Sequence, residues 1–177
     1  MAKEAAITTL AGAVNVEILP SVLGGRVKRT FDLLAALILI VTLSPFFFFI
    51  IMLLTVSYPD PVFYRHPRVG YKGKTFDCYK FRTMIADSET KLKTLLESDL
   101  TAREEWKQNR KLKNDPRITG IGLILRKLSF DELPQLINVL LGDMSLVGPR
   151  PIVIDELSKY GDAYGLYLSA RPGMTGP

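Results

Sequence analysis

The stretch that decides the fold is Leu33–Val56, LLAALILIVTLSPFFFFIIMLLTV, in which none of the 24 residues carries a charge. A helix of this length rises about 36 Å, which exceeds the roughly 30 Å of a bilayer core. The segment starts too far from Met1 for a usual secretory signal peptide and lacks a small-residue cleavage site. No second stretch of this kind occurs. We therefore expect attachment to a membrane through one element, which excludes a polytopic channel or transporter.

Pro45 lies near the middle of this segment, directly after Ser44. A proline inside a helix removes one backbone hydrogen bond and clashes with the preceding turn, so a kink or break is expected at Ser44-Pro45. The Ser44 hydroxyl is available to satisfy the freed carbonyl. Two paths stay open: a single-pass helix kinked at proline, and a re-entrant helix that is broken there and returns to the face it entered.

Both flanks of the apolar segment are basic. Arg26, Lys28 and Arg29 precede it, and six further cations follow within residues 65–82. Lys- and Arg-rich flanks are typical of the cytoplasmic side, and a straight span cannot place both of its ends there. The charge pattern therefore favours the re-entrant path.

The overall composition narrows the class of protein. Hydrophobic residues make up 47% and charged residues 23%, which is typical of a folded domain. The one cysteine, Cys78, and the one histidine, His66, exclude a disulfide framework, a Cys-rich zinc site and a histidine-pair metal site. The net charge of +5 favours an anionic partner, namely a phosphate-bearing ligand, a nucleic acid or an anionic lipid.

The chain divides into a lead-in (1–25), a membrane helix (26–57) and a catalytic domain (58–177). After the proline pair at 59–61, short strands are predicted at 62–64 and 75–82, joined by a turn. The predicted fold class is α+β and mostly helical: a re-entrant membrane helix plus a small cytoplasmic helical domain with a short β-hairpin.

Helical periodicity follows the strand pair. Thr101 and Glu104 have the spacing of a capping box, which suggests that a second helix starts within the stretch 87–113. Gly142 is placed to end the helix predicted at 132–141. The predicted helical ranges are 87–113, 121–128, 132–141, 152–160 and 163–170.

Two adjacent carboxylates, Asp131 and Glu132, precede Leu133-Pro134 at the start of a predicted helix. One interpretation is structural: Asp131 caps the helix, or Ser129 and Glu132 form a capping box. The other is chemical, because a helix start also binds anions and several cations lie nearby in sequence: Arg117, Arg126, Lys127 and Arg150. A carboxylate kept ionised by such cations can attack phosphorus, and its neighbour can hold Mg²⁺.

Lys80 and Arg82 form a second basic candidate, since alternate strand residues share a face and two cations suit a diphosphate. The structural alternative is a basic strand edge on lipid headgroups. The stretch 70–75 lacks the glycine of an NTPase phosphate loop, because Arg68 stands at that position. Trp106 and the lysines of 91–113 are interpreted as a solvated helix face, so nucleic-acid binding is not supported.

Five motifs occur in a fixed order: Lys28-Arg29-Thr30-Phe31-Asp32 ahead of the apolar stretch interrupted at Ser44-Pro45, Tyr79-Lys80-Phe81-Arg82-Thr83-Met84, Leu128-Ser129-Phe130-Asp131-Glu132-Leu133-Pro134-Gln135, Gly142-Asp143-Met144-Ser145-Leu146-Val147-Gly148-Pro149-Arg150-Pro151, and Arg171-Pro172-Gly173-Met174-Thr175-Gly176. With these motifs the chain resembles the bacterial sugar transferase family, the monotopic polyprenyl-phosphate phosphoglycosyl transferases. The resemblance runs from about Arg26 to the last residue. The stretch 152–167 is most similar to members that transfer galactose- or glucose-phosphate.

The resemblance implies transfer of a sugar-1-phosphate from a UDP-sugar to undecaprenyl phosphate, with release of UMP and a covalent phosphosugar-enzyme intermediate. It implies Asp131 as the nucleophile and Glu132 as the ligand of a Mg²⁺ cofactor. Pro149 and Pro151 would shape the cleft, and the bend at Ser44-Pro45 would turn Asp131 toward the cytoplasmic surface of the bacterial inner membrane. The cations implied in phosphate or substrate binding are Lys80, Arg82, Arg117, Arg126, Arg150 and Arg171.

The implied pathways are the synthesis of exopolysaccharide and of lipopolysaccharide O-antigen. The expected partners are the UDP-sugar, undecaprenyl phosphate and membrane lipids, with a homo-oligomer as a further candidate and no nucleic acid. Phe130 replaces the more usual leucine of the family. The sequence ends at Pro177, before a family loop that completes the nucleotide-sugar pocket, which suggests truncation. The alternative function is therefore a catalytically silent, membrane-anchored homologue that acts as an assembly partner.

Overall fold

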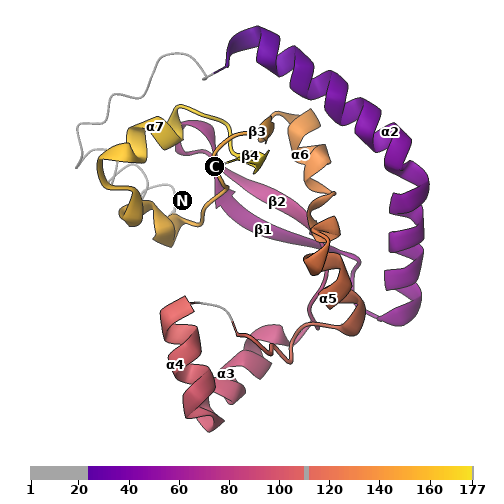
Figure 1. The fold of residues 1–177 in the computed structure, drawn as a ribbon, viewed down its shortest axis with the longest axis vertical. Helices are drawn as coiled ribbons and strands as arrows, with labels where there is room; N and C mark the ends of the chain where they lie inside the picture. The colour runs from indigo at the N-terminus through magenta and orange to yellow at the C-terminus, as the bar shows by residue number, and fades with distance from the viewer. Residues whose placement is uncertain (1–23, 110–111, 177) are drawn as a thin grey trace. The chain divides into compact units, whose positions relative to one another are not determined.

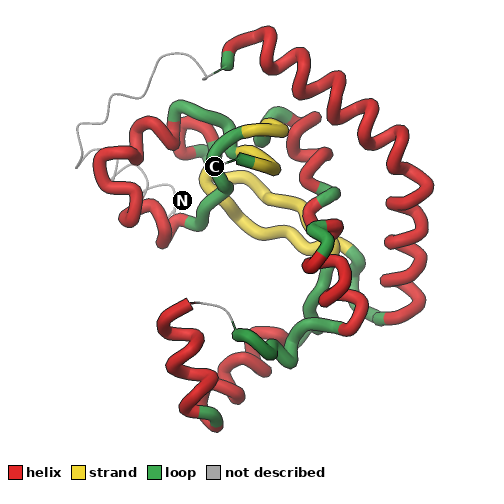
Figure 2. Tube along the Cα trace, in the orientation of Figure 1, coloured by secondary structure: helices red, strands yellow, loops and turns green. Residues whose placement is uncertain are grey.

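The computed structural model describes residues 24–109 and 112–176, so nearly all of the lead-in predicted at 1–25 lies outside the described residues. Figures 1 and 2 show a mostly helical chain with two small strand pairs, which confirms the α+β class. The elements are α2 (Gly25–Ser57), β1 (Phe63–Val69), η1 (Tyr71–Gly73), β2 (Thr75–Phe81), α3 (Ser88–Ser98), α4 (Leu100–Asn109), α5 (Gly120–Lys127), η2 (Phe130–Glu132), α6 (Gln135–Leu141), β3 (Ser145–Val147), η3 (Ile154–Ala163), α7 (Tyr164–Leu168) and β4 (Gly173–Thr175).

The apolar segment forms one helix, α2, of 33 residues with Pro45 inside it. The predicted break at Ser44-Pro45 is therefore wrong as an interruption of the helix. The reason is local: Pro45 cannot donate to the carbonyl of Val41, and the Ser44 hydroxyl donates to that carbonyl at 2.8 Å instead. This hydrogen bond, in place of the missing backbone one, confirms the expected role of Ser44.

The apolar side chains of α2 are largely exposed. Val41, Phe48 and Val56 are 64%, 68% and 82% exposed, whereas Ala36, Ile50 and Leu54 are buried. By length and composition α2 is able to cross a membrane. So much uncovered apolar surface distinguishes it from the core helix of a soluble protein and favours contact with lipid.

By its internal contacts the chain forms two units. We define the first unit as residues 24–47, 65–80 and 134–176, and the second unit as 48–64, 81–109 and 112–133. Each unit combines segments that are far apart in sequence.

In the first unit, α6 packs along β2 through a buried asparagine. The Asn138 amide donates to the Asp77 carbonyl at 2.7 Å and accepts from the Tyr79 backbone N–H at 3.0 Å. Around this contact lies an apolar core of buried residues: Ala36, Phe76, Cys78, Leu136, Val139 and Met144. The helix ends at Gly142, as predicted, with a left-handed φ of 97° that favours glycine.

The second strand pair was not predicted. β3 and β4 pair in parallel, with Ser145 opposite Gly173 and Val147 opposite Thr175. The two residues of each pair are 28 positions apart in the sequence. Two of the sequence motifs therefore lie side by side. Gly173 is required at this crossing, because a Cβ there would lie 2.1 Å from the backbone nitrogen of Gly148.

A smaller core in the first unit joins β1 to α7. The Tyr167 hydroxyl donates to the Val69 carbonyl at 2.7 Å and accepts from the Ile152 N–H at 3.2 Å. Burial raises the pKa of this hydroxyl to about 12, so it stays a donor. As predicted from the two helical ranges 152–160 and 163–170, the helical stretch is interrupted at Gly161, whose φ is 47°.

In the second unit, the predicted helical range 87–113 splits into α3 and α4. The predicted capping box is wrong, because the Asp99 side chain accepts from the backbone N–H groups of Thr101 and Ala102 at 2.8 and 3.1 Å. The carboxylate of Asp99 thus caps α4, two residues before the predicted cap Thr101.

Candidate functional site

Asp131 and Glu132 lie in η2, a single 3-10 turn between α5 and α6. The prediction that Asp131 caps the next helix is wrong, because α6 begins at Gln135 after Pro134. The predicted capping box also fails, since the Ser129 side chain makes no capping hydrogen bond. Ser129 instead adopts a left-handed conformation with φ 58°. Such strain in a non-glycine residue is frequent at functional sites.

α5 brings Arg126 close to this turn. The helix starts at Thr119, whose hydroxyl accepts from the Gly122 N–H at 3.0 Å. The backbone N–H of Thr119 donates to the Thr83 carbonyl at 3.0 Å, which fixes α5 against the segment that follows β2. Gly122 is needed for this approach, since a Cβ there would lie 2.2 Å from the Thr83 carbonyl oxygen.

The Arg126 guanidinium is oriented by a side chain from another element. Its Nε donates to the hydroxyl of Thr83 at 2.7 Å, and Thr83 is buried. Burial lowers the pKa of Arg126, and the charges of Asp131 and Asp115 oppose that change. Arg126 is therefore a partly desolvated cation under the influence of two carboxylates, of which Asp131 is the stronger.

Arg117, predicted to bind phosphate, is buried and paired with Asp115. Its Nε and Nη2 donate to the two carboxylate oxygens at 2.8 and 2.6 Å, and its guanidinium lies 5.1 Å from the centre of the Trp106 ring. Burial tends to raise the pKa of Asp115, but the hydrogen bonds and charge of Arg117 outweigh it and lower the pKa. Two of the donor nitrogens of Arg117 are thus used within the protein.

The predicted pair of Lys80 and Arg82 is divided between the units. Lys80 is in β2 and belongs to the first unit, whereas Arg82 follows the end of the strand and belongs to the second. The backbone N–H of Arg82 donates to the Val62 carbonyl at 2.7 Å. The Nε of Arg82 is buried and has no hydrogen-bond partner among the described residues.

The remaining predicted residues lie in the first unit. The turn of Pro149, Arg150 and Pro151 is held at both ends: Gly173 donates to the Pro149 carbonyl at 2.8 Å and Arg68 to the Pro151 carbonyl at 3.2 Å. The Arg150 side chain is exposed. The structure thus brings Arg117, Arg126 and Asp131 together in one unit, and Lys80, Arg150 and Arg171 belong to the other.

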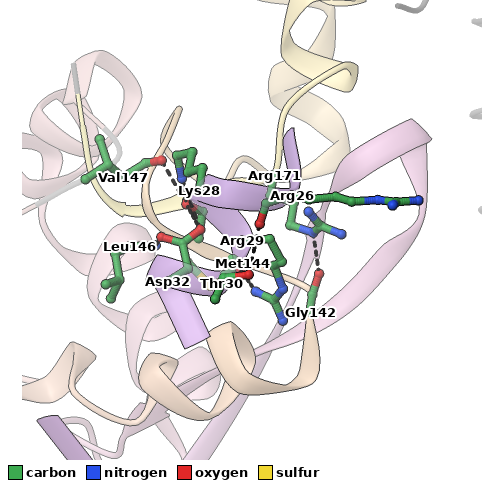
Figure 3. A network of polar contacts seen from close by, with 11 residues as sticks. Arg26, Lys28, Arg29, Thr30, Asp32, Gly142, Met144, Leu146, Val147 and Arg171 are labelled. Carbon is green, nitrogen blue, oxygen red and sulfur yellow. Dashed lines mark hydrogen bonds and ion pairs between the residues drawn. The ribbon is translucent and has the colours of Figure 1, made fainter. Parts of the chain in front are cut away.

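The sequence did not predict a polar network that lies at the start of α2 (Figure 3). Asp32 is only 3% exposed and accepts from the Ser145 hydroxyl at 2.8 Å, the Leu146 N–H at 3.2 Å and the Lys28 ammonium at 3.1 Å. The i, i+4 spacing of Lys28 and Asp32 was a signal for the ion pair. Nothing in the sequence pattern indicated the partners more than 100 residues away.

The magnesium site predicted at η2 would need further ligands from substrate and water. Within residues 24–109 and 112–176, no three His, Cys, Asp or Glu side chains gather into a metal site. Magnesium commonly uses one or two carboxylates together with phosphate oxygens and water. Asp131 and Glu132 supply adjacent carboxylates of that kind.

The family model described as bacterial sugar transferase matches residues 23–177, and the chain belongs to this family.

Among its curated relatives, the undecaprenyl-phosphate galactose phosphotransferase of Salmonella typhimurium is 54% identical over 84% of the chain. The exopolysaccharide production protein ExoY of Sinorhizobium fredii is 49% identical over 87% of the chain and 68% of its own length. A UDP-N-acetylgalactosamine-undecaprenyl-phosphate N-acetylgalactosaminephosphotransferase of Aeromonas hydrophila is 35% identical over 95% of the chain. The chain spans about a third of the length of the Salmonella relative, which matches over 31% of its own residues.

Proposed function

We propose that this protein transfers a sugar-1-phosphate from a UDP-sugar to undecaprenyl phosphate and releases UMP. The names of the Salmonella and Aeromonas relatives describe sugar-phosphate transfer to undecaprenyl phosphate, and that of the Sinorhizobium relative describes exopolysaccharide production. The proposed role is therefore an early membrane step in the synthesis of exopolysaccharide, O-antigen or a related glycoconjugate.

The observation that carries the proposal is the buried carboxylate of Asp131 beside the oriented cation Arg126. Asp131 is 8% exposed, and its charge acts on the guanidinium that Thr83 holds. An aspartate carboxylate whose charge acts on a neighbouring cation is available as a nucleophile toward phosphorus. The same cation is placed to balance the charge of a phosphoryl group under attack.

The reaction has two displacements at one phosphorus atom. In the first, an Asp131 oxygen bonds to the phosphorus that carries the sugar, the bond from that phosphorus to the bridging oxygen breaks, and UMP leaves with the bridging oxygen. In the second, an oxygen of undecaprenyl phosphate attacks the same phosphorus, and the Asp131 carboxylate is released. A covalent intermediate divides one difficult displacement into two easier ones.

Glu132 would hold Mg²⁺, which supplies charge neutralisation at the diphosphate when it is bound. The other cations predicted to contact phosphate or substrate are Lys80, Arg82, Arg150 and Arg171, with Pro149 and Pro151 shaping the cleft. For Arg117 we propose an indirect role, because its bidentate pair with Asp115 leaves fewer donors for substrate.

The proposed location is the cytoplasmic face of the bacterial inner membrane, with α2 entering and leaving by that face. The basic residues on both flanks of α2 support this path. Because α2 is continuous, the path requires a bend within the helix at Ser44-Pro45. A re-entrant helix would keep Asp131 at the level where a lipid phosphate meets a soluble nucleotide-sugar.

The function is tested by UMP release from a panel of UDP-sugars with undecaprenyl phosphate and Mg²⁺. We expect release with at least one donor from the native protein, and a loss of about 10³-fold or more in Asp131→Asn. Asp87→Asn is the matched control, since Asp87 is exposed and makes no capping bond at α3. Equal rates in the native protein and Asp131→Asn would refute the assignment, and no release from either would favour the silent assembly partner.

The path of α2 is tested with single cysteines in a Cys78→Ala background. Val27→Cys and Pro61→Cys lie at the two ends of the helix and are exposed. A membrane-impermeant thiol reagent should label both only when the cytoplasmic face is open. Labelling of the two sites from opposite sides would restore the single-pass path.

A further inference from the structure

We propose that the cavity at the start of α2, in the first unit, is a phosphate-binding site in which Lys28, Arg29 and Arg171 bind a phosphate monoester, so that the phosphate contact proposed above for Arg171 is made here. The site is a cavity of about 290 Å³ between the first turns of α2 and the loops next to β3 and β4. It is formed by the first unit alone and involves neither Asp131 nor Arg126.

Charge is the first argument. Three cations line the cavity, Lys28, Arg29 and Arg171, against one lining carboxylate, Asp32. Asp32 is already committed, because it accepts from Ser145, Leu146 and Lys28. The charge of Arg171 acts on the Arg29 guanidinium, and the charges of Asp32 and Asp143 oppose it. The lining therefore retains an excess of positive charge.

Donor capacity is the second argument. An arginine has five N–H donors in a planar fork that matches phosphate. The only hydrogen bond of the Arg171 side chain among the described residues runs from Nε to the Gly142 carbonyl at 2.9 Å. Arg29 makes two long bonds of 3.4 Å, to the carbonyls of Met144 and Leu140. Figure 3 shows the two guanidinium groups held beside these carbonyls.

The backbone adds further positive character. Gly24 and Gly25 line the cavity at the N-terminal end of α2, a 33-residue helix, where backbone N–H groups lack partners within the helix. Gly148 lines it next to β3. A Cβ at Gly25 would have no neighbour within 4 Å, so the backbone there is open to a ligand.

The volume selects a small ligand group. Typical ligand cavities run from about 300 to 1,000 Å³, so this one suits a phosphate monoester rather than a whole nucleotide-sugar. Since α2 is the apolar helix, the phosphate can come from a lipid headgroup or from a free phosphate. The chemistry is the same in both cases.

A structural role of these cations as caps of α6 is the competing explanation. Arg29 and Arg171 do bond to carbonyls at the end of α6. Capping uses only part of the N–H donors of the two arginines. The ion pair with Asp32 accounts for Lys28, and neither contact accounts for the cavity. The two explanations differ in whether a phosphate protects the guanidinium groups.

The test is arginine footprinting of the native protein in neutral detergent. Phenylglyoxal modifies accessible guanidinium groups, and mass spectrometry reads each arginine separately. Inorganic phosphate, compared with chloride at equal ionic strength, should slow modification of Arg29 and Arg171 about tenfold and leave the exposed Arg103 unchanged. No protection of Arg29 and Arg171 would overturn the proposal. Protection at Arg126 is a separate result that bears on the proposed function.

Two further arms identify the source and the residues. Phosphatidic acid in the micelle, against phosphatidylcholine, tests the lipid source; stronger protection than by inorganic phosphate assigns the site to a lipid, and equal protection assigns it to free phosphate. Arg171→Gln should raise the apparent Kd for phosphate, measured by thermal shift, at least about tenfold, whereas Lys113→Gln and Asp131→Asn should not. Unchanged phosphate affinity in a folded Arg171→Gln would contradict the site.

Discussion

Each unit of the molecule holds a buried aspartate beside cations, but the two surroundings are built differently. In the first unit, Asp32 binds groups that lie more than 100 residues away, Ser145 and Leu146. In the second unit, Asp131 lies in a 3-10 turn next to Ser129, a residue in a left-handed conformation. The first arrangement connects distant segments, and the second stores local strain next to a desolvated arginine. This difference agrees with the proposal that Asp32 serves mainly stability and that Asp131 serves chemistry.

The largest effect is expected from Gly122→Ala, which disturbs the packing around Arg126 and Asp131 in the second unit. The new Cβ would lie 2.2 Å from the Thr83 carbonyl oxygen, so α5 must move away from that segment. We expect a loss of about 3 kcal/mol of stability and of most UMP release. Gly120→Ala is the matched control in the same helix, since nothing lies within 4 Å of its Cβ. It should stabilise by about 0.5–1 kcal/mol, measured by thermal unfolding; a fall like that of Gly122→Ala would argue against the close packing.

Asp32→Ala removes the buried aspartate that connects distant segments of the first unit. It leaves the Leu146 N–H and the Lys28 ammonium without this acceptor, whereas the Ser145 hydroxyl can still donate to the Val147 carbonyl at 3.0 Å. We expect a loss of about 2–3 kcal/mol, read as a lower thermal midpoint in detergent. Asp87→Ala, at an exposed position, should change the midpoint little. If both variants unfold at the native temperature, Asp32 does not stabilise the first unit.

Thr83→Val sharpens the comparison by removing only the hydroxyl that orients Arg126. Because the hydrogen bond of 2.7 Å is lost and the volume is kept, kcat should fall about tenfold with a smaller change in KM. Thr83→Ser should restore the rate, and Thr101→Val, at an exposed position, should have no effect. A rate for Thr83→Val equal to the native rate would show that Arg126 needs no such positioning.

The smallest effect is expected from the pH dependence of the first unit through His66. Burial, with the charges of Arg68 and Lys80, lowers the pKa of His66, and Glu156 opposes them. The folded pKa thus lies below the ordinary value of about 6.5, so stability is full above that value and is lost as the pH falls through the folded pKa. The thermal midpoint of the native protein should drop more between pH 7.5 and 5.5 than that of His66→Gln. An equal drop of the thermal midpoint in the native protein and in His66→Gln would show that His66 does not contribute to the pH dependence of stability.

Local patterns predicted much of the fold. The end of α2 at Ser57, the end of α6 at Gly142 and the split at Gly161 follow from the end of the charge-free stretch or from glycine, which are local signals. The Ser44 hydroxyl was assigned to the correct carbonyl for the same reason. The capping interpretation of Asp131 and Glu132 fails, because capping spacing is common and does not show which turn the chain forms at Ser129.

Long-range pairing could not be predicted. The parallel pairing of β3 with β4 and the partners of Asp32 depend on which distant segments meet, and three-residue strands carry no readable period. Thr83 lay within a recognised motif, but only the packing of α5 against its backbone reveals that it holds Arg126. The candidate nucleophile was found from sequence, and the residue that orients its cation was found from structure.

The central claim is that Asp131 becomes covalently bound to the phosphosugar, and trapping that species tests it most directly. The native protein is mixed with a UDP-sugar labelled in the sugar, without undecaprenyl phosphate, quenched in acid and digested. The account predicts a labelled peptide whose added mass, that of a hexose phosphate, maps to Asp131 and disappears when undecaprenyl phosphate is added. A folded preparation that releases UMP yet carries no label on Asp131 would contradict it.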